Sequence, residues 1–178
     1  MMTTLCKNDT LLFLGDSITD CGRDRLDATD LGKGFPAFVA AHLAAEYPDA
    51  NLSFVNRGIS GNKIRDILNR IEEDCIDLKP DLLIFLIGIN DTWRNIGTSS
   101  FGTPEATATF ASDYRQFLQQ VTESGIKKIL LLEPFVLPYP ADRKQWRKDL
   151  DPKIHSIREL AAEFGCDYLP LDGLFAER

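Results

Sequence analysis

The chain has 178 residues, enough for one domain with a real core, since a domain of this size buries roughly 70% of its unfolded-chain surface. Hydrophobic residues make up 44% and charged residues 26%, as in ordinary globular proteins, and the formal net charge is −7. This acidic balance argues against nucleic acid as a partner, because non-specific binding to phosphates needs a basic surface.

The cysteines and the N-terminus bear on the compartment. Cys6, Cys21, Cys75 and Cys166 are far apart and form no CxxC pair, which predicts free thiols in a reducing compartment and no metal site. The apolar stretch at residues 11–14 is too short for a signal peptide or a membrane span. We therefore expect a cytoplasmic protein with no membrane span.

Five short apolar runs predict β-strands. Continuous apolar runs are typical of strands covered on both faces, as in a parallel sheet. The runs lie at residues 11–14, 52–55, 82–87, 129–132 and 168–169.

The segments between these runs carry helix signals. Thr, Pro and Glu at residues 103–105 read as an N-cap, a first-turn proline and a first-turn acid, so a helix should run from there to about Ser124 and end at Gly125. Asp-Pro at residues 151–152 repeats the start signal, and Gly165 repeats the stop. Helical spacing predicts one more buried face, formed by Ile64, Ile67, Leu68, Ile71, Cys75 and Leu78.

This alternation of strands and helices predicts a single α/β sandwich with a mostly parallel sheet and right-handed crossovers. Ligands of such sheets bind in loops at the carboxyl ends of the strands. The residues that follow each strand are therefore the candidates for a site.

Three such loops carry residues suited to acyl transfer. Gly15-Asp16-Ser17 follows the first strand, Gly58 the second, and Gly88-Ile89-Asn90-Asp91 the third. Acyl transfer needs an oxygen nucleophile and donors directed at the oxyanion of the tetrahedral intermediate. Ser17 at a helix start offers its own N–H, Gly58 lets the backbone approach closely, and Asn90 offers a neutral NH₂ donor.

These three blocks, in this order, resemble those of the SGNH hydrolase superfamily of GDSL-type lipases and esterases. The resemblance implies a flavodoxin-like three-layer α/β/α sandwich with a five-stranded parallel sheet. It also implies a cofactor-free hydrolase of small-molecule esters, with small acyl groups, often acetyl, on carbohydrates or lipids. Ser17 would be the nucleophile and first oxyanion donor, Gly58 the backbone donor and Asn90 the side-chain donor.

The resemblance also implies an Asp-x-x-His block near the C-terminus, in which the His takes the serine proton, and a last helix. Asp172 has no His three residues later. His42 shares a helix face with apolar residues, which predicts a partly buried core histidine, and His155 lies opposite an apolar stripe, which predicts a solvated one. We therefore expect residues 1–178 to be one C-terminally incomplete domain that lacks its last helix, is impaired as an enzyme and is open to homo-oligomer formation.

Asp16, Trp93 and Arg94 are further candidates for substrate binding. Trp93 and Arg94 begin a long loop, residues 91–103, that could form a pocket wall, although a surface anchor is as good a reading. Asp16 could instead hold its loop by backbone hydrogen bonds. The proline-rich segment 134–140 also follows a strand, and either a site wall or simple packing fits it.

A non-enzymatic flavodoxin-like binding module is the alternative. A phosphoacceptor receiver needs an acidic pair after the first strand and a Lys after the last, but Ser17 follows Asp16 and residues 166–170 contain no Lys. A flavin binder needs a phosphate loop, and the acidic segment 15–23 would repel phosphate. The sequence therefore favours a serine ester hydrolase.

Overall fold

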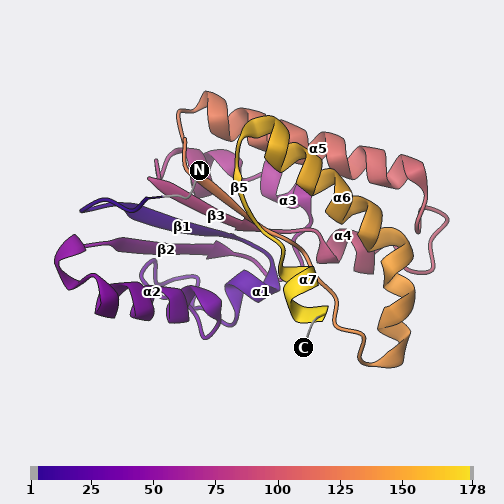
Figure 1. Ribbon diagram of the computed structural model, residues 1–178, viewed down its shortest axis with the longest axis horizontal. Helices are drawn as coiled ribbons and strands as arrows, with labels where there is room; N and C mark the ends of the chain where they lie inside the picture. The colour runs from indigo at the N-terminus through magenta and orange to yellow at the C-terminus, as the bar shows by residue number, and fades with distance from the viewer. Residues whose placement is uncertain (1–3, 177–178) are drawn as a thin grey trace.

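The computed structural model describes residues 4–176 as a three-layer α/β/α sandwich (Figure 1). Its single sheet has five parallel strands in the order β2-β1-β3-β4-β5, as the sequence predicts. The strands are β1 (Thr10–Gly15), β2 (Ser53–Gly58), β3 (Leu82–Leu86), β4 (Ile129–Leu132) and β5 (Asp167–Leu169).

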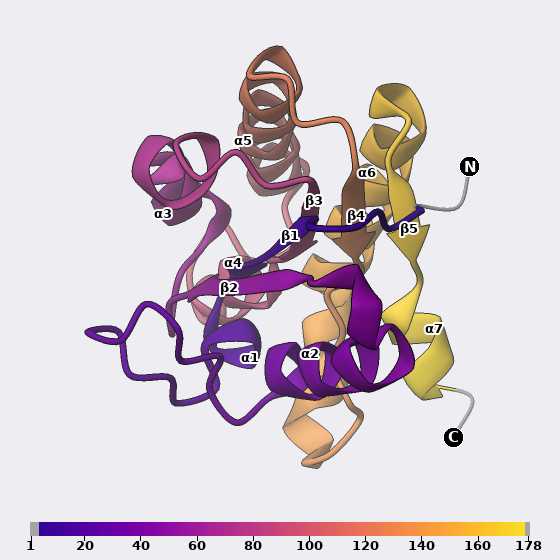
Figure 2. The ribbon, with the colours of Figure 1, turned by 90° about the vertical axis from the view of Figure 1, so that its left-hand side faces the viewer.

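Helices cover both faces of the sheet. Figure 2 shows α3, α5 and α6 on one face, and α1, α2 and α7 on the other. The helices are α1 (Ser17–Asp20), α2 (Phe35–Glu46), α3 (Ile64–Leu68), α4 (Ile89–Trp93), α5 (Pro104–Glu123), α6 (Arg147–Phe164) and α7 (Leu171–Ala176). None of those within residues 4–176 combines the length and apolar character needed to cross a bilayer.

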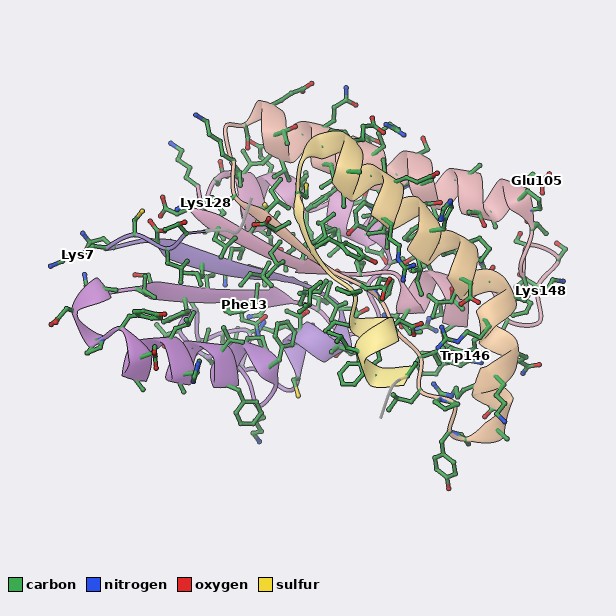
Figure 3. The ribbon with its side chains drawn as sticks, in the orientation of Figure 1. Lys7, Phe13, Glu105, Lys128, Trp146 and Lys148 are labelled. Atoms are coloured by element: carbon green, nitrogen blue, oxygen red, sulfur yellow. The ribbon has the colours of Figure 1, made fainter. Side chains whose placement is uncertain are left out.

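The two halves of the core follow from the alternation of side chains along the strands. Leu12 and Leu14 of β1 pack in the cluster shared with α3, α5 and α6, whereas Leu11 and Phe13 pack toward α2. Phe13, labelled in Figure 3, meets Phe35 of α2 edge to face with ring centroids 5.7 Å apart. Strands buried on both faces explain the continuous apolar runs in the sequence.

Helix α5 confirms the predicted signals, and α6 corrects one. Thr103 caps α5 by accepting a 3.2 Å hydrogen bond from the Ala106 N–H, and Gly125 follows the helix with φ +96°. Helix α6 begins at Arg147, so the prediction of a start at Asp151-Pro152 is wrong. A 3-10 helix, Ala141–Trp146, leads directly into it, and burial of Trp146 stabilises these earlier turns.

Two segments differ from a simple reading of helical periodicity. The face predicted from Ile64 to Leu78 is buried at Ile64, Ile67, Ile71 and Cys75, but α3 ends at Leu68 and a π-helical turn, Glu72–Ile76, continues it. After β5 the chain forms α7, which the sequence analysis did not anticipate. Leu171 of α7 packs against the cluster on the α2 face.

The strand register brings the three candidate loops to one edge. Gly15 at the end of β1 pairs with Gly58 at the end of β2 and with Leu86 at the end of β3. Strands β2 and β3 lie on opposite sides of β1, so the strand order reverses here. Such a switch point is where open α/β sheets bind their ligands.

Candidate active site

Ser17 is an exposed residue at the first position of α1, directly after β1. The Asp16 carboxylate caps this helix, since its Oδ1 accepts a 3.0 Å hydrogen bond from the Ile18 N–H. A Cβ on Gly15 would lie 2.3 Å from the Leu86 carbonyl oxygen, so only glycine lets the end of β1 approach β3 this closely. Ser17 is thus exposed to solvent, while the residues before it are held by the Asp16 cap and by the close approach of Gly15 to β3.

Asp16 has no exposed surface, so the prediction that it contacts substrate is wrong. Its Oδ2 is buried and has no hydrogen-bond partner among the residues that the structure describes. Burial raises the pKa of Asp16 to about 6, and the hydrogen bond from Ile18 offsets only part of that effect. Asp16 therefore has a structural place, as the buried cap of the helix that begins at Ser17.

The loop after β2 is anchored on α1. The Ile59 N–H donates to the Gly15 carbonyl at 3.0 Å, and the Ser60 N–H and Oγ–H donate to Asp20 Oδ2 at 2.8 and 3.0 Å. Burial acts to raise the pKa of Asp20, but hydrogen bonds from Arg25 and Ser60 outweigh it and lower that pKa. An ionised Asp20 therefore fixes this loop beside Ser17.

Gly58 lies at the predicted edge, but its amide is occupied. The Gly58 N–H donates a 2.8 Å hydrogen bond to Asn56 Oδ1, and a Cβ at this position would lie 2.3 Å from the Asp20 nitrogen. An amide already bonded inside the protein is not available to an oxyanion, so the assignment of Gly58 as backbone donor is corrected. The glycine is needed for the close contact with α1.

Gly61 is the residue that the sequence analysis passed over. It has φ +85°, and an added Cβ would meet only the Arg94 Nη2 atom, at 3.6 Å. No hydrogen bond is recorded for the Gly61 N–H among residues 4–176. The signal was a second glycine in Gly58-Ile59-Ser60-Gly61-Asn62, placed beyond the strand rather than within it.

Asn90 occupies the second position of α4 and is 2% exposed. Its Nδ2 donates a 3.0 Å hydrogen bond to the Asn62 carbonyl, next to Gly61 in the chain. One of its two amide hydrogens remains for another acceptor. The first and third predicted loops are therefore joined through the second.

Trp93 and Arg94 lie at the end of α4, beside this edge. Trp93 is 53% exposed and stacks on Trp146, with ring centroids 5.9 Å apart. The Arg143 guanidinium lies 4.2 Å from the Trp146 ring and 5.8 Å from the Trp93 ring, and Arg94 lies 6.0 Å from the Trp93 ring. The loop of residues 91–103, predicted as a pocket wall, is helical at its start and presents an aromatic and cationic surface.

The histidines lie away from this edge. His155 is exposed on α6, as predicted, and its Nε2 lies 3.3 Å from Glu159 Oε1. His42 is exposed on α2, so the prediction of a partly buried histidine is wrong. Asp172 accepts hydrogen bonds from the Val136 N–H at 3.3 Å and from Arg147 Nη1 at 2.5 Å.

The proline-rich segment 134–140 also borders a cavity. Val136, Leu137 and Pro138 line a cavity of about 460 Å³, together with Phe175 of α7. Neither Ser17 nor Asn90 lines this cavity, so a wall of the candidate site stays a prediction for the segment.

Comparison with known proteins gives consistent matches. Residues 13–178 match the model of the GDSL-like lipase/acylhydrolase family. An acetylxylan esterase from Geobacillus stearothermophilus is 34% identical over 176 residues, covering 95% of this chain and 78% of that protein.

Solved structures give the same result. A GDSL-like protein from Parabacteroides merdae has a TM-score of 0.87 at 35% identity, covering 96% of this chain and 80% of that one. The acetylxylan esterase Axe2 from Geobacillus stearothermophilus has a TM-score of 0.83 at 32% identity, covering 98% and 81%. Structures of Axe2 with a serine, an aspartate or a histidine replaced are described as catalytic mutants. The matches do not favour the alternative of a non-enzymatic module.

Proposed function

Since the chain belongs to the GDSL-like lipase/acylhydrolase family of carboxylic ester hydrolases, we propose that Ser17 is the nucleophile of an esterase that removes acetyl groups from carbohydrates. The observation that carries the proposal is the exposed Ser17 at the start of α1, on the same sheet edge as Gly61 and Asn90.

In the proposed reaction, Ser17 Oγ attacks the ester carbonyl carbon and the carbonyl electron pair moves onto oxygen. The Ser17 N–H, the Gly61 N–H and the free Asn90 amide hydrogen then stabilise this oxyanion. Collapse of the intermediate breaks the bond to the alcohol, which leaves with a proton, and the acyl-serine is hydrolysed by water. Loss of one oxyanion donor typically lowers kcat by about 100- to 1000-fold.

The serine proton needs an acceptor in this scheme. Neither His42 nor His155 is at the Ser17 edge, and both Asp172 oxygens are engaged by Val136 and Arg147. Oxyanion stabilisation and binding without the triad typically leave a rate about 1000- to 10000-fold above that in water. We propose that residues 4–176 carry the nucleophile and the oxyanion hole, and that an added base can accept the proton of Ser17.

The carbohydrate part of the proposal rests on two observations. The relatives from Geobacillus stearothermophilus, matched in sequence and in structure, are named as acetylxylan esterases. Trp93 offers an exposed aromatic face beside Arg94, whose guanidinium reaches toward Gly61. Such a face can pack against the apolar side of a sugar ring, while the indole N–H and guanidinium donate to hydroxyl groups.

The test measures hydrolysis of p-nitrophenyl acetate by the wild-type chain and by Ser17→Ala, with and without imidazole. Imidazole supplies a general base, and the Ser17→Ala variant reports the direct reaction of imidazole with the ester. We expect imidazole to increase the wild-type rate over the variant, with acetate accumulating on Ser17 in the intact mass. Equal rates for the two proteins at every imidazole concentration would overturn the proposal.

A further inference from the structure

Asp91 follows Asn90 in α4, and its carboxylate lies at the start of α3. Its Oδ1 and Oδ2 atoms lie 3.4 and 3.3 Å from the Ile64 nitrogen, so the Ile64 N–H is shared between them. Ile64 is the first residue of α3, and the turn that contains Gly61 and Asn62 leads directly into this helix. A side chain of α4 therefore holds the end of the Gly61 turn.

A second link runs beside the first. Asn90 Nδ2 donates to the Asn62 carbonyl at 3.0 Å. Two consecutive residues of α4 therefore bind Asn62 and Ile64, which lie two residues apart where the loop after β2 enters α3. The geometry points to Asp91 as a positioning residue. Its carboxylate fixes the start of α3 to α4 and so keeps the Gly61 N–H and the Asn90 side-chain amide in fixed positions relative to each other. The effect of Asp91 on catalysis rests on the proposed function. The hydrogen bonds that link α4 to Asn62 and Ile64 are independent of that function.

The surroundings of Asp91 shift the protonation of its carboxyl group into the neutral pH range. Asp91 lines a cavity of about 360 Å³ between α3, α4, α5 and α6. Burial raises the pKa of Asp91 to about 7, partly offset by the hydrogen bond from Ile64 and by the charges of Lys153 and Lys63.

The other charges at this cavity are largely paired. Arg65 Nη2 and Asp113 Oδ1 are 2.5 Å apart, and the buried Lys153 forms an ion pair with Asp149. Within residues 4–176, the Asp91 carboxylate receives two long contacts from the Ile64 N–H and forms no salt bridge. Its carboxylate can therefore gain or lose a proton without breaking another ion pair, and the hydrogen bond to Ile64 is weaker when the group is neutral.

The test compares Asp91→Ala, which removes the acceptor, with Asp91→Asn, which keeps an acceptor oxygen but cannot titrate. Asp66→Ala is the matched control, because Asp66 Oδ2 accepts the Lys63 N–H at 2.9 Å and also caps α3. Within residues 4–176, Asp66 forms no hydrogen bond or salt bridge with α4. We expect Asp91→Ala to lower kcat for p-nitrophenyl acetate, measured with imidazole, by about 10-fold or more with little change in KM, since misplaced donors lose transition-state stabilisation. Asp91→Asn should restore most of kcat, and Asp66→Ala should leave it within about twofold.

A second readout does not depend on turnover. In NMR spectra recorded from pH 5.5 to 8.5, the side-chain amide of Asn90 should shift with a midpoint near 7 in the wild-type protein and should not do so in Asp91→Asn. The same titration in both proteins, or equal losses of kcat in Asp91→Ala and Asp66→Ala, would overturn the inference. If Ser17→Ala shows that the esterase proposal is wrong, the NMR comparison alone still decides whether Asp91 positions Asn90.

Discussion

The side-chain carbonyl of Asn56 accepts a 2.8 Å hydrogen bond from the Gly58 N–H, within the last three residues of β2. The amide of the same side chain donates to the carbonyls of Thr19 at 2.8 Å and Leu31 at 2.9 Å. Asn56 is fully buried, so its hydrogen bonds are made away from water. One side chain therefore joins the end of β2, helix α1 and the loop that precedes α2.

This arrangement predicts a large cost for Asn56→Ala. The change removes three hydrogen bonds and leaves the buried Gly58 N–H and Thr19 carbonyl, and the half-buried Leu31 carbonyl, without this partner. Each buried group left unpaired costs about 1–3 kcal/mol if no water replaces the side chain. We expect a loss of at least about 3 kcal/mol in urea unfolding. Thr109→Ala, which removes an exposed 2.9 Å hydrogen bond from the Thr109 hydroxyl to the Glu105 carbonyl within α5, should change stability by less than about 1 kcal/mol. Similar small losses for the two variants would contradict this account of Asn56.

The two glycines of the second loop should respond differently to alanine. Gly58→Ala would place a Cβ 2.3 Å from the Asp20 nitrogen and 2.7 Å from the Thr19 carbonyl carbon, so backbone must move, and we expect a loss of more than about 3 kcal/mol. Gly61→Ala meets no such contact but keeps φ near +85°, which costs about 1–2 kcal/mol in a non-glycine residue. Thermal unfolding of the two variants measures the difference, and the reverse order would refute the assignment of their roles.

Asp16 predicts a pH dependence of stability with a definite sign. Its folded pKa of about 6 lies above the ordinary 3.8, so its contribution is fully present below pH 3.8 and is lost as pH rises through 6. Asparagine keeps the cap on Ile18 without the buried charge. Asp16→Asn should therefore be more stable than wild type by about 3 kcal/mol at pH 8, with almost no difference at pH 3.5.

Urea unfolding at the two pH values measures this difference for Asp16→Asn. Asp16→Ala serves as the control, because it also removes the buried charge but loses the cap, at about 1 kcal/mol, at every pH. A stability difference between wild type and Asp16→Asn that does not change with pH would show that Asp16 titrates normally.

Replacement of Trp93 should impair hydrolysis of a carbohydrate ester more than hydrolysis of a small aliphatic ester. Trp93→Ala should raise KM for an acetylated xylo-oligosaccharide by about 10-fold, which corresponds to about 1.4 kcal/mol, and should change hydrolysis of a small aliphatic acetate by less than about threefold. Trp93→Phe keeps an aromatic face and should retain most of the affinity for the saccharide. Steady-state kinetics with imidazole present measure both, and equal effects on the two substrates would exclude a sugar-binding role for Trp93.

The sequence by itself determined the strands, their parallel arrangement and the sheet edge at which the candidate site lies. Apolar runs such as residues 82–87 specify buried strands because every side chain must leave water, and this signal is local. Ser17 and Asn90 could be found for the same reason, since each comes directly after such a strand. The caps at Thr103 and Gly165 were equally local.

Only the tertiary structure decided which backbone amide is free. The difference between Gly58 and Gly61 depends on Asn56, whose partner cannot be read from spacing, and on the close approach of α1. The same holds for Asp16 and Asp91, because burial by distant segments, and not sequence neighbours, raises their pKa values. Local sequence specifies local backbone geometry, whereas the availability of a donor or the proton on an acid depends on everything that packs around it.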